Sequence, residues 1–296
     1  MPTASGSLHP AVHFDTTEGD HMKVFLTGAT GYIGSAVLRA LLANGHTVTA
    51  AVRTEEKAAA VREAGARAVV VDLTDRVALA PLLRQAEGVI HTASAPDVDP
   101  VFVPIVLNEL VHSPTQFVHT SGIWLFGNNP AITEESEPEP PEIVSWRVPL
   151  DRQVINSNVN TAIVAPAVVY GGQGGVTQLL AGNGSAPTAL VGDGGQRWTL
   201  VHVDDLAELY VRVLEKGAAV GYVIGASGEN PTVREIAESA GPGTQVLEEA
   251  PDASRERLGA PFADALLQDQ AATGAYAKAA YDWAPSHGDW LKTERA

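Results

Sequence analysis

The sequence predicts an α/β fold, in which a doubly wound parallel sheet is joined to a small C-terminal lobe. Three observations support this prediction. A β-branched and aromatic run at residues 23–27 passes directly into glycines spaced G-x-x-G-x-x-G, and an apolar pattern of helical period follows at residues 35–42. Short apolar runs then alternate with helical patterns along the chain. With 296 residues, 45% of them hydrophobic, the chain can bury a large core.

The glycines of the first turn have separable roles. Gly28 lets the chain leave the strand at positive φ, and Gly31 omits the Cβ that would block a pyrophosphate. Gly34 lets the helix pack closely on the strand. The first free N–H groups of the helix then face an anion, with support from the helix dipole. The turn therefore predicts a dinucleotide site, and the alternative is a tight turn that binds nothing.

This turn and several later segments resemble the extended and atypical short-chain dehydrogenase/reductase superfamily, of the NAD-dependent epimerase/dehydratase type. The resemblance extends from Met22 to the end of the chain. It implies a Rossmann-type dinucleotide-binding domain over residues 22–170. Residues 171–296 are then mainly a substrate-binding lobe, with strand and helix segments that return to the sheet. Residues 1–21 are polar and aperiodic, and are interpreted as a disordered leader or tag.

The second predicted strand, residues 46–53, ends on the residue that selects the cofactor. An acid there would bind the ribose hydroxyls of NAD, whereas Arg53 offers a planar fork to a 2′-phosphate. Lys57 lies one turn further on. We therefore expect NADP(H) as the preferred cofactor, with NAD(H) as the alternative. In that alternative, Arg53 stacks on the adenine or points to solvent.

The next predicted elements are a helix at 54–65, a strand at 66–71, a helix at 75–85 broken near Pro81, a strand at 88–95 and a helix at 101–111. The strands at 66–71 and 88–95 end in segments that contact the cofactor in the superfamily. With the first turn and later segments, the resemblance implies this set of cofactor-binding residues: Gly28, Thr30, Gly31, Tyr32, Ile33, Gly34, Asp72, Leu73, Thr92, Ala93, Ser94, Thr120, Pro166 and Val168.

Catalytic groups are expected from the fifth strand, residues 116–122. The superfamily uses a Ser or Thr to polarise a carbonyl, and a Tyr-x-x-x-Lys pair to deliver the proton. Thr120 and Ser121 are candidates for the first role, although the alignment also allows Gly122 at that position. Alternatively, both hydroxyls cap the strand end.

The Tyr-x-x-x-Lys pair is absent. No tyrosine lies between Tyr32 and Tyr170, and no lysine lies between Lys57 and Lys216. In a first explanation, Arg147 stabilises an oxyanion while water, Tyr170 or Ser121 delivers the proton, since arginine is no acid at neutral pH. In a second, the reaction needs no such acid. In a third, the chain binds NADP(H) without turnover. Arg147 could instead form a surface salt bridge with Asp151.

Later segments supply the remaining predictions. Residues 128–142 are rich in Pro and Glu and are expected to form an exposed loop. A sixth strand at 161–165 leads into a segment similar to the superfamily's R-P-x-x-V-Y-G signature, where Tyr170 either lines the substrate pocket or packs beneath the loop. By the same resemblance, Asp205 caps the helix that follows His202. The substrate-pocket candidates are Trp124, Trp146, Arg197 and Trp198.

The amino-acid composition limits the kinds of partner that the chain is expected to bind. The 35 acidic and 19 basic residues give a formal charge of −16, which disfavours nucleic acid and anionic membranes. The absence of cysteine excludes disulfides and thiolate metal sites, and no metal-ligand cluster is apparent in the sequence. No apolar run reaches the roughly 18 residues of a membrane span, and a cytoplasmic location is expected. The partner is then a small-molecule substrate, and a homodimer is usual for the superfamily.

Taken together, these features predict NADPH-dependent reduction of a small organic carbonyl, enone or imine, with a non-standard proton-delivery site. One alternative is a non-catalytic NADP(H)-binding regulator or scaffold. A second is a nucleotide-sugar epimerase or dehydratase, which would also need the missing tyrosine to remove a hydroxyl proton.

Overall fold

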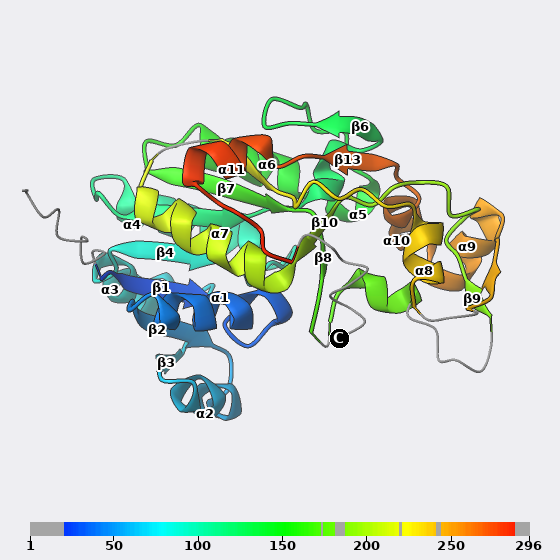
Figure 1. The fold of residues 1–296 in the computed structure, drawn as a ribbon. Helices are drawn as coiled ribbons and strands as arrows, with labels where there is room; N and C mark the ends of the chain where they lie inside the picture. The colour runs from blue at the N-terminus through cyan, green and yellow to red at the C-terminus, as the bar shows by residue number, and fades with distance from the viewer. Residues whose placement is uncertain (1–20, 173, 181–186, 219–220, 241–243, 288–296) are drawn as a thin grey trace, which may run out of the picture.

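A computed structural model describes residues 21–172, 174–180, 187–218, 221–240 and 244–287 (Figure 1). Except for His21, the predicted leader at residues 1–21 lies outside the described residues. A seven-stranded parallel sheet has the order β11-β7-β5-β4-β1-β2-β3. Its strands are β1 (Lys23–Thr27), β2 (Thr47–Val52), β3 (Arg67–Val70), β4 (Gly88–His91), β5 (Gln116–Thr120), β7 (Thr161–Pro166) and β11 (Tyr222–Gly225). The strand order reverses between β1 and β4, where such sheets bind ligands. The predicted doubly wound α/β fold is confirmed.

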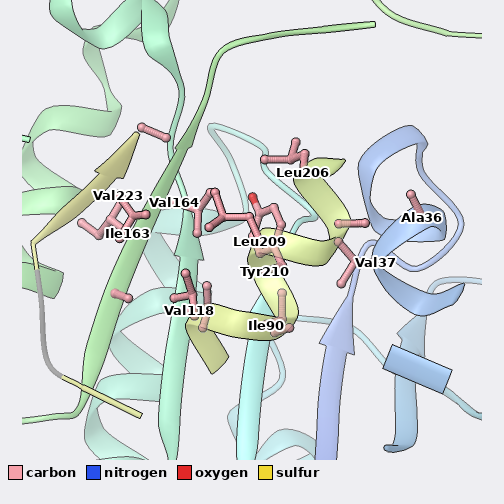
Figure 2. Packing of buried hydrophobic residues seen from close by; sticks show 14 of the residues in the cluster. Ala36, Val37, Ile90, Val118, Ile163, Val164, Leu206, Leu209, Tyr210 and Val223 are labelled. Carbon is pink, nitrogen blue, oxygen red and sulfur yellow. The ribbon is translucent and has the colours of Figure 1, made fainter. Parts of the chain in front are cut away.

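Helices cover both faces of the sheet. One face carries α1 (Tyr32–Ala43), α7 (Val203–Lys216) and α11 (Ala275–Tyr281); the other carries α3 (Arg76–Arg84), α4 (Asp99–Leu110) and α6 (Arg147–Ile155). The helix α2 (Glu55–Glu63) packs beside β2 and β3. Figure 2 shows Leu206, Leu209 and Tyr210 of α7 packed over the strands, beside Val37 of α1. These side chains are buried, so the apolar core fixes the strand ends that build the site.

Short parallel strand pairs and short helices lie outside the seven-stranded sheet. Strand β8 (Val168–Tyr170) pairs with β10 (Leu200–His202), β9 (Thr188–Ala189) with β12 (Val246–Leu247), and β6 (Asn129–Ile132) with β13 (Gln270–Ala272). The helices are α5 (Glu142–Ser145), α8 (Val233–Glu238), α9 (Pro251–Leu258) and α10 (Ala260–Leu266), with 3₁₀ turns η1 (Ile123–Phe126) and η2 (Val176–Leu180). Helices α8, α9 and α10 gather beyond the carboxyl edge of the sheet, at the right of Figure 1.

Two local predictions are wrong. Pro81 does not break its helix, because α3 continues through it to Arg84. The carbonyl that loses its intrahelical partner belongs to Val77, whose side chain is 85% exposed, while Leu79 and Leu83 hold the helix on the core. The acidic loop at 128–142 is not loop throughout, since it contains strand β6. Its partner β13 lies about 140 residues later, so no local pattern indicates the pairing.

Candidate functional site

The glycine-rich turn joins β1 to α1 at the point where the strand order reverses. Gly28 has φ +76°, and its carbonyl accepts a 2.8 Å hydrogen bond from the N–H of Gly31, the N-cap of α1. A Cβ on Gly34 would lie 2.1 Å from the Gly28 carbonyl oxygen and 2.5 Å from Thr92 Oγ1. Among the described residues, a Cβ on Gly31 would meet only that carbonyl, at 3.3 Å. Gly28 and Gly34 are therefore needed for the backbone path and the packing, whereas Gly31 leaves room for a ligand.

A first cavity of about 290 Å³ opens beside this turn. It lies between the glycine-rich turn and the carboxyl ends of β2, β3 and β4. Nine of the predicted cofactor residues line it: Gly28, Thr30, Gly31, Arg53, Lys57, Leu73, Thr92, Ala93 and Ser94. Asp72 is not among its lining residues. The Asp72 carboxylate accepts hydrogen bonds from the N–H and hydroxyl of Thr74, and these bonds lower its pKa.

The charged side chains that line the first cavity are all basic. Arg53 and Lys57 are its only charged lining residues among those the structure describes. Within that part of the chain, neither side chain has an ion-pair partner. Two cations that form no ion pair, in a lining without a described acidic residue, suit a phosphate rather than a pair of ribose hydroxyls.

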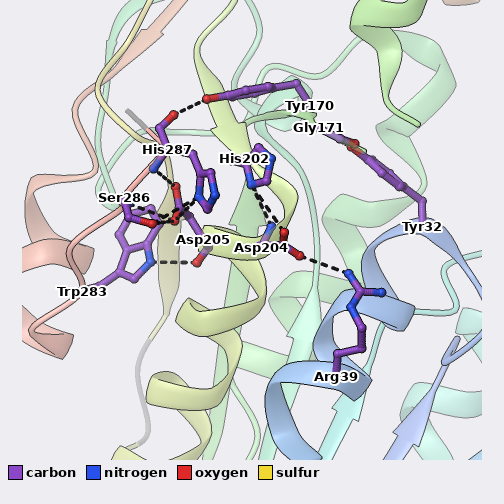
Figure 3. Close-up of polar contacts among 10 residues, drawn as sticks. All are labelled: Tyr32, Arg39, Tyr170, Gly171, His202, Asp204, Asp205, Trp283, Ser286 and His287. Atoms are coloured by element: carbon purple, nitrogen blue, oxygen red, sulfur yellow. Dashed lines mark hydrogen bonds and ion pairs between the residues drawn. The ribbon is translucent and has the colours of Figure 1, made fainter. Parts of the chain in front are cut away.

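A second cavity of about 250 Å³ lies on the other side of the turn, where Tyr32 and Ile33 begin α1. Its lining comes from α1, the end of β5, η1 and the segment after β7: Tyr32, Ile33, Ser121, Ile123, Trp124, Pro166, Ala167, Val168, Val169, Gly175 and Val176. These described lining residues carry no charge. The Tyr32 hydroxyl is already used, because it donates to the Gly171 carbonyl at 2.7 Å (Figure 3).

Thr120 and Ser121 point to opposite faces of the sheet, as successive strand residues do. The Thr120 hydroxyl pairs with the Tyr210 hydroxyl at 2.7 Å beneath α7, and Thr120 lines neither cavity. The Thr120 hydroxyl is therefore not available for the catalytic and cofactor-binding roles that were predicted for it. Ser121 lines the second cavity, and its hydroxyl donates to Asp151 Oδ2 at 2.6 Å.

Arg147 lies at the start of α6 and is half-buried. Its guanidinium donates to the Thr120 carbonyl at 3.0 Å, at the end of β5, and lies 4.7 Å from the centroid of the Trp146 ring. Burial lowers the Arg147 pKa, and the charges of Asp151 and Asp99 act against this shift. The alternative of a surface salt bridge with Asp151 is wrong, because Asp151 is fully buried and its partners are other residues. Arg147 does not line either cavity. It could therefore affect a ligand only indirectly, by holding the backbone at the end of β5 through the Thr120 carbonyl.

Tyr170 cannot serve as the predicted proton donor in this arrangement. Its side chain is 1% exposed, and its hydroxyl donates to the His287 carbonyl (Figure 3). The ring packs edge-on against His202 at a centroid distance of 5.3 Å. Tyr170 therefore joins the C-terminal segment to β8 and is absent from the lining of the second cavity.

Of the four predicted substrate residues, only Trp124 lines the second cavity. Trp146 lies outside both cavities, against the Arg147 guanidinium. Arg197 is turned toward the lobe, where it forms two hydrogen bonds of 2.8 and 2.7 Å with the Asp269 carboxylate. Trp198 is 2% exposed, and its indole N–H donates to the Leu266 carbonyl at 2.9 Å. The predicted substrate roles of Arg197 and Trp198 are corrected by these contacts, because both side chains hold the lobe together.

His202, and not Asp205, is the N-cap of α7, since its ring accepts from the Asp204 N–H. The Asp205 carboxylate instead accepts from the N–H groups of Ser286 and His287 at 3.0 Å (Figure 3). Burial acts to raise the Asp205 pKa, but the hydrogen bonds from the His287 ring and from the N–H groups of Ser286 and His287 outweigh it, and the pKa is lowered. The His202 and His287 rings stack at 3.9 Å and 17°. One ligand atom each of His202, Asp205 and His287 lies within 4.8 Å of the others, so this group has the spacing of a metal site that the sequence did not indicate. This cluster anchors the C-terminal segment.

The sequence analysis did not predict which residues contact Ser121. Asp151 Oδ2 also accepts from the Tyr222 hydroxyl at 3.1 Å, and Asp151 Oδ1 lies 3.4 Å from His119 Nε2. One signal was available. Asp151 stands between Leu150 and Val154 on the buried side of α6, where an acidic residue is unusual.

Several known proteins are similar to this chain in sequence. The sequence model of a family described as NAD(P)H-binding matches residues 28–217. An uncharacterized protein of Schizosaccharomyces pombe is 31% identical over 231 residues, covering 73% of this chain and 78% of the relative. One of Saccharomyces cerevisiae is 33% identical over 215 residues, covering 66% and 72%. A sterol-4-alpha-carboxylate 3-dehydrogenase of Dictyostelium discoideum is 24% identical over 222 residues, covering 66% and 68%.

Solved structures share the fold. UDP-glucose 4-epimerase of Thermus thermophilus, in complex with NAD, superposes with a TM-score of 0.69 at 21% identity and covers 92% of this chain and 97% of its own. A human epimerase family protein with NADPH has a TM-score of 0.72 at 18% identity, with 93% and 98% covered. Among the described residues, no helix is both long and apolar enough to cross a membrane.

Proposed function

Since the chain belongs to the NAD(P)H-binding family of the atypical short-chain dehydrogenase/reductase type, we propose that it is an NADP(H)-dependent reductase of a small, apolar carbonyl, enone or imine. The observation that carries this proposal is the pairing of two cavities across one turn. Residues 28–31 border a cavity with two cations, and residues 32–33 border an uncharged cavity that contains Ser121.

The first cavity fits the nucleotide end of the cofactor. Gly31 leaves the space that a Cβ would fill, and α1 directs its free N–H groups toward it. Arg53 and Lys57 would hold the 2′-phosphate, and Leu73 would pack on the adenine. When bound, NADPH supplies a hydride to the substrate carbon.

The second cavity suits an apolar substrate. Ser121 supplies a hydroxyl at the end of β5, and Trp124, Ile33 and Val176 surround it with apolar surface that excludes water. Arg147 would fix the peptide before Ser121 through the Thr120 carbonyl. A nucleotide sugar would bring a diphosphate, for which the described lining offers no cation. This disfavours the epimerase or dehydratase alternative.

A non-catalytic NADP(H)-binding regulator is the second candidate. The observation that favours it is the absence of the Tyr-x-x-x-Lys pair from the segment that leads into α6. Such a protein would bind the cofactor in the first cavity and leave it unreacted.

Calorimetric titration with NADPH, NADP⁺, NADH and NAD⁺, followed by a panel of apolar aldehydes, ketones, enones and imines, tests the proposal. We expect the phosphorylated cofactors to bind more tightly, and NADPH to be oxidised with at least one apolar substrate. Binding without oxidation across the panel would support the regulator. Failure of all four cofactors to bind would contradict both.

Arg147→Ala should lower kcat roughly tenfold, which corresponds to about 1.4 kcal/mol of transition-state stabilisation. The reason is that the Thr120 carbonyl loses its donor and the adjoining Ser121 loses its fixed position. The Kd for NADPH should stay within about twofold, since Arg147 does not line the first cavity. Arg152→Ala, a change at the exposed neighbouring arginine, is the control for helix charge. Equal kcat values for the two variants would show that Arg147 has no specific role in turnover.

Tyr170→Phe should leave kcat almost unchanged, because the Tyr170 hydroxyl is occupied by the His287 carbonyl. The free energy of unfolding should fall by about 1 kcal/mol for the lost buried hydrogen bond. Urea denaturation and steady-state kinetics on the same preparation measure both effects. A large loss of kcat in a stably folded variant would restore Tyr170 as the proton donor.

A further inference from the structure

A buried carboxylate lies directly behind Ser121. Asp151 is 0% exposed, and its Oδ2 accepts hydrogen bonds from two hydroxyls, those of Ser121 at 2.6 Å and Tyr222 at 3.1 Å. Its Oδ1 lies 3.4 Å from the His119 ring nitrogen Nε2. These contacts suit the ionised side chain, because a carboxylate accepts hydrogen bonds and donates none. A negative charge therefore lies behind the wall of the second cavity, one hydrogen bond away from Ser121.

The neighbouring groups add little positive charge. Arg147 interacts with Asp151 but also with the buried Asp99 of α4, so one guanidinium is shared by two carboxylates. His91 contacts Asp99 Oδ1 at 3.2 Å, and burial lowers the His91 pKa, so this ring is neutral at pH 7. Burial and the Asp151 charge raise the Tyr222 pKa, so Tyr222 keeps its proton and serves as a donor. Among these groups, negative charges outnumber positive ones.

The hydrogen bond to Asp151 determines what Ser121 can offer a ligand. A serine hydroxyl has one proton, and here it is donated to Asp151 Oδ2. The serine oxygen can still accept a hydrogen bond from a ligand, and the contact with a carboxylate makes it a stronger acceptor. While that contact persists, Ser121 cannot donate to a carbonyl oxygen. The hydroxyl therefore suits a ligand that brings its own donor.

The rest of the described lining is poorly equipped for a carbonyl group. Besides Ser121, its side chains with an O–H or N–H group are Tyr32 and Trp124. The Tyr32 hydroxyl donates to the Gly171 carbonyl at 2.7 Å. The Trp124 indole can donate a hydrogen bond but gives up no proton at neutral pH. A carbonyl reduced here would become an alkoxide without a nearby acid to protonate it.

We propose that the second cavity selects an iminium ion that carries an N–H group, with Ser121 accepting from this N–H and Asp151 stabilising its positive charge. The inference rests on the proposed reductase function and names its substrate class. The carbon of the C=N bond gains a hydride from NADPH, and the π electron pair moves to nitrogen. The products are a neutral amine and NADP⁺. The nitrogen already holds its proton, so the step needs neither the missing tyrosine nor the missing lysine. Asp151 acts through Ser121 and is a positioning residue.

Three bicyclic probes of similar size separate charge from hydrogen bonding. Protonated dihydroisoquinoline has the charge and the N–H, its N-methyl iminium has the charge alone, and tetralone is an uncharged ketone. The second cavity, at about 250 Å³, has room for such a molecule. Because the probes differ in intrinsic reactivity, the test compares the kcat/KM of each probe between variants, at a pH where the imine is protonated.

Ser121→Ala removes the acceptor and keeps the Asp151 charge. The kcat/KM for protonated dihydroisoquinoline should fall at least about tenfold, and that for the N-methyl iminium by less than about threefold. Asp151→Asn removes the charge and keeps the size of the side chain. The kcat/KM for both iminium ions should then fall at least about tenfold, while that for tetralone should fall by less than about threefold.

Tyr222→Phe is the matched control. It removes the other hydroxyl that contacts Asp151 Oδ2, but it leaves the Asp151 charge and the Ser121 contact in place. A role of Asp151 in packing alone would make this variant resemble Asp151→Asn. We expect instead that the ratio of kcat/KM for protonated dihydroisoquinoline to that for tetralone stays within about twofold of its value in the unmodified protein.

A second readout needs no turnover. With NADPH bound, calorimetric titration compares tetrahydroisoquinoline, which is an ammonium ion at neutral pH, with tetralol, a neutral alcohol of similar size. Asp151→Asn should weaken binding of the ammonium ion at least about tenfold and binding of tetralol by less than about threefold. Equal losses for the two ligands would contradict a role for the Asp151 charge.

Two kinetic outcomes distinguish this inference from the function on which it rests. If tetralone is reduced and neither Ser121→Ala nor Asp151→Asn changes the preference among the probes, the inference is wrong and the reductase function stands. If NADPH is oxidised with none of the three probes and with no member of the wider panel, the proposed function is wrong and this inference with it.

Discussion

Gly34→Ala is expected to destabilise the protein by about 3 kcal/mol and to abolish cofactor binding. The added Cβ would lie 2.1 Å from the Gly28 carbonyl oxygen and 2.6 Å from its carbonyl carbon. Both are backbone atoms, so relief requires movement of the whole turn, including the Gly31 N–H bond that closes it. Urea denaturation and calorimetry with NADPH measure the two effects.

Two other glycines make the Gly34 experiment specific. Gly31→Ala places its Cβ 3.3 Å from the Gly28 carbonyl and beside the first cavity, so it should weaken NADPH binding more than it affects stability. Gly221→Ala meets no atom of the described residues within 4 Å and should change neither quantity appreciably. Normal stability of the Gly34 variant would mean that α1 and β1 are not packed as closely as the structure has them.

Arg53→Ala should weaken NADPH binding by about 1–3 kcal/mol, and NADH binding far less. Arg53 lines the first cavity with no ion-pair partner among the described residues, so its guanidinium is available to a 2′-phosphate that NADH lacks. Calorimetric titration with both cofactors measures the difference between the two losses.

The control for Arg53→Ala is Arg62→Ala. Arg62 lies on α2 and pairs with Glu55, outside the lining of the first cavity, so its removal changes the net charge equally. It should leave both affinities nearly unchanged. An equal loss of NADPH and NADH affinity in Arg53→Ala would overturn the preference for NADP(H).

The sequence by itself determined the sheet and the first cavity. The glycine spacing, the end of β2 and the ends of β3 and β4 are local patterns, each readable within about a dozen residues. In a parallel sheet the carboxyl ends of strands meet at one edge, so these separate segments had to line one cavity. This is why nine of the predicted cofactor residues gather there, and why the family could be identified from the same segments.

Only the tertiary structure decided which hydroxyls are available. Thr120 meets Tyr210 across 90 residues, Tyr170 meets His287 across 117, and Tyr222 meets Asp151 across 71. Each contact depends on which helix or strand covers a given face, and a one-residue difference at the end of β5 sends Thr120 and Ser121 to opposite faces. Such pairings have no local signal, because their partners are fixed by packing between distant segments. The sequence therefore indicated the region of the first cavity, while the packing of α6, α7 and β11 around β5 determined that Ser121, and not Thr120, lines the second cavity.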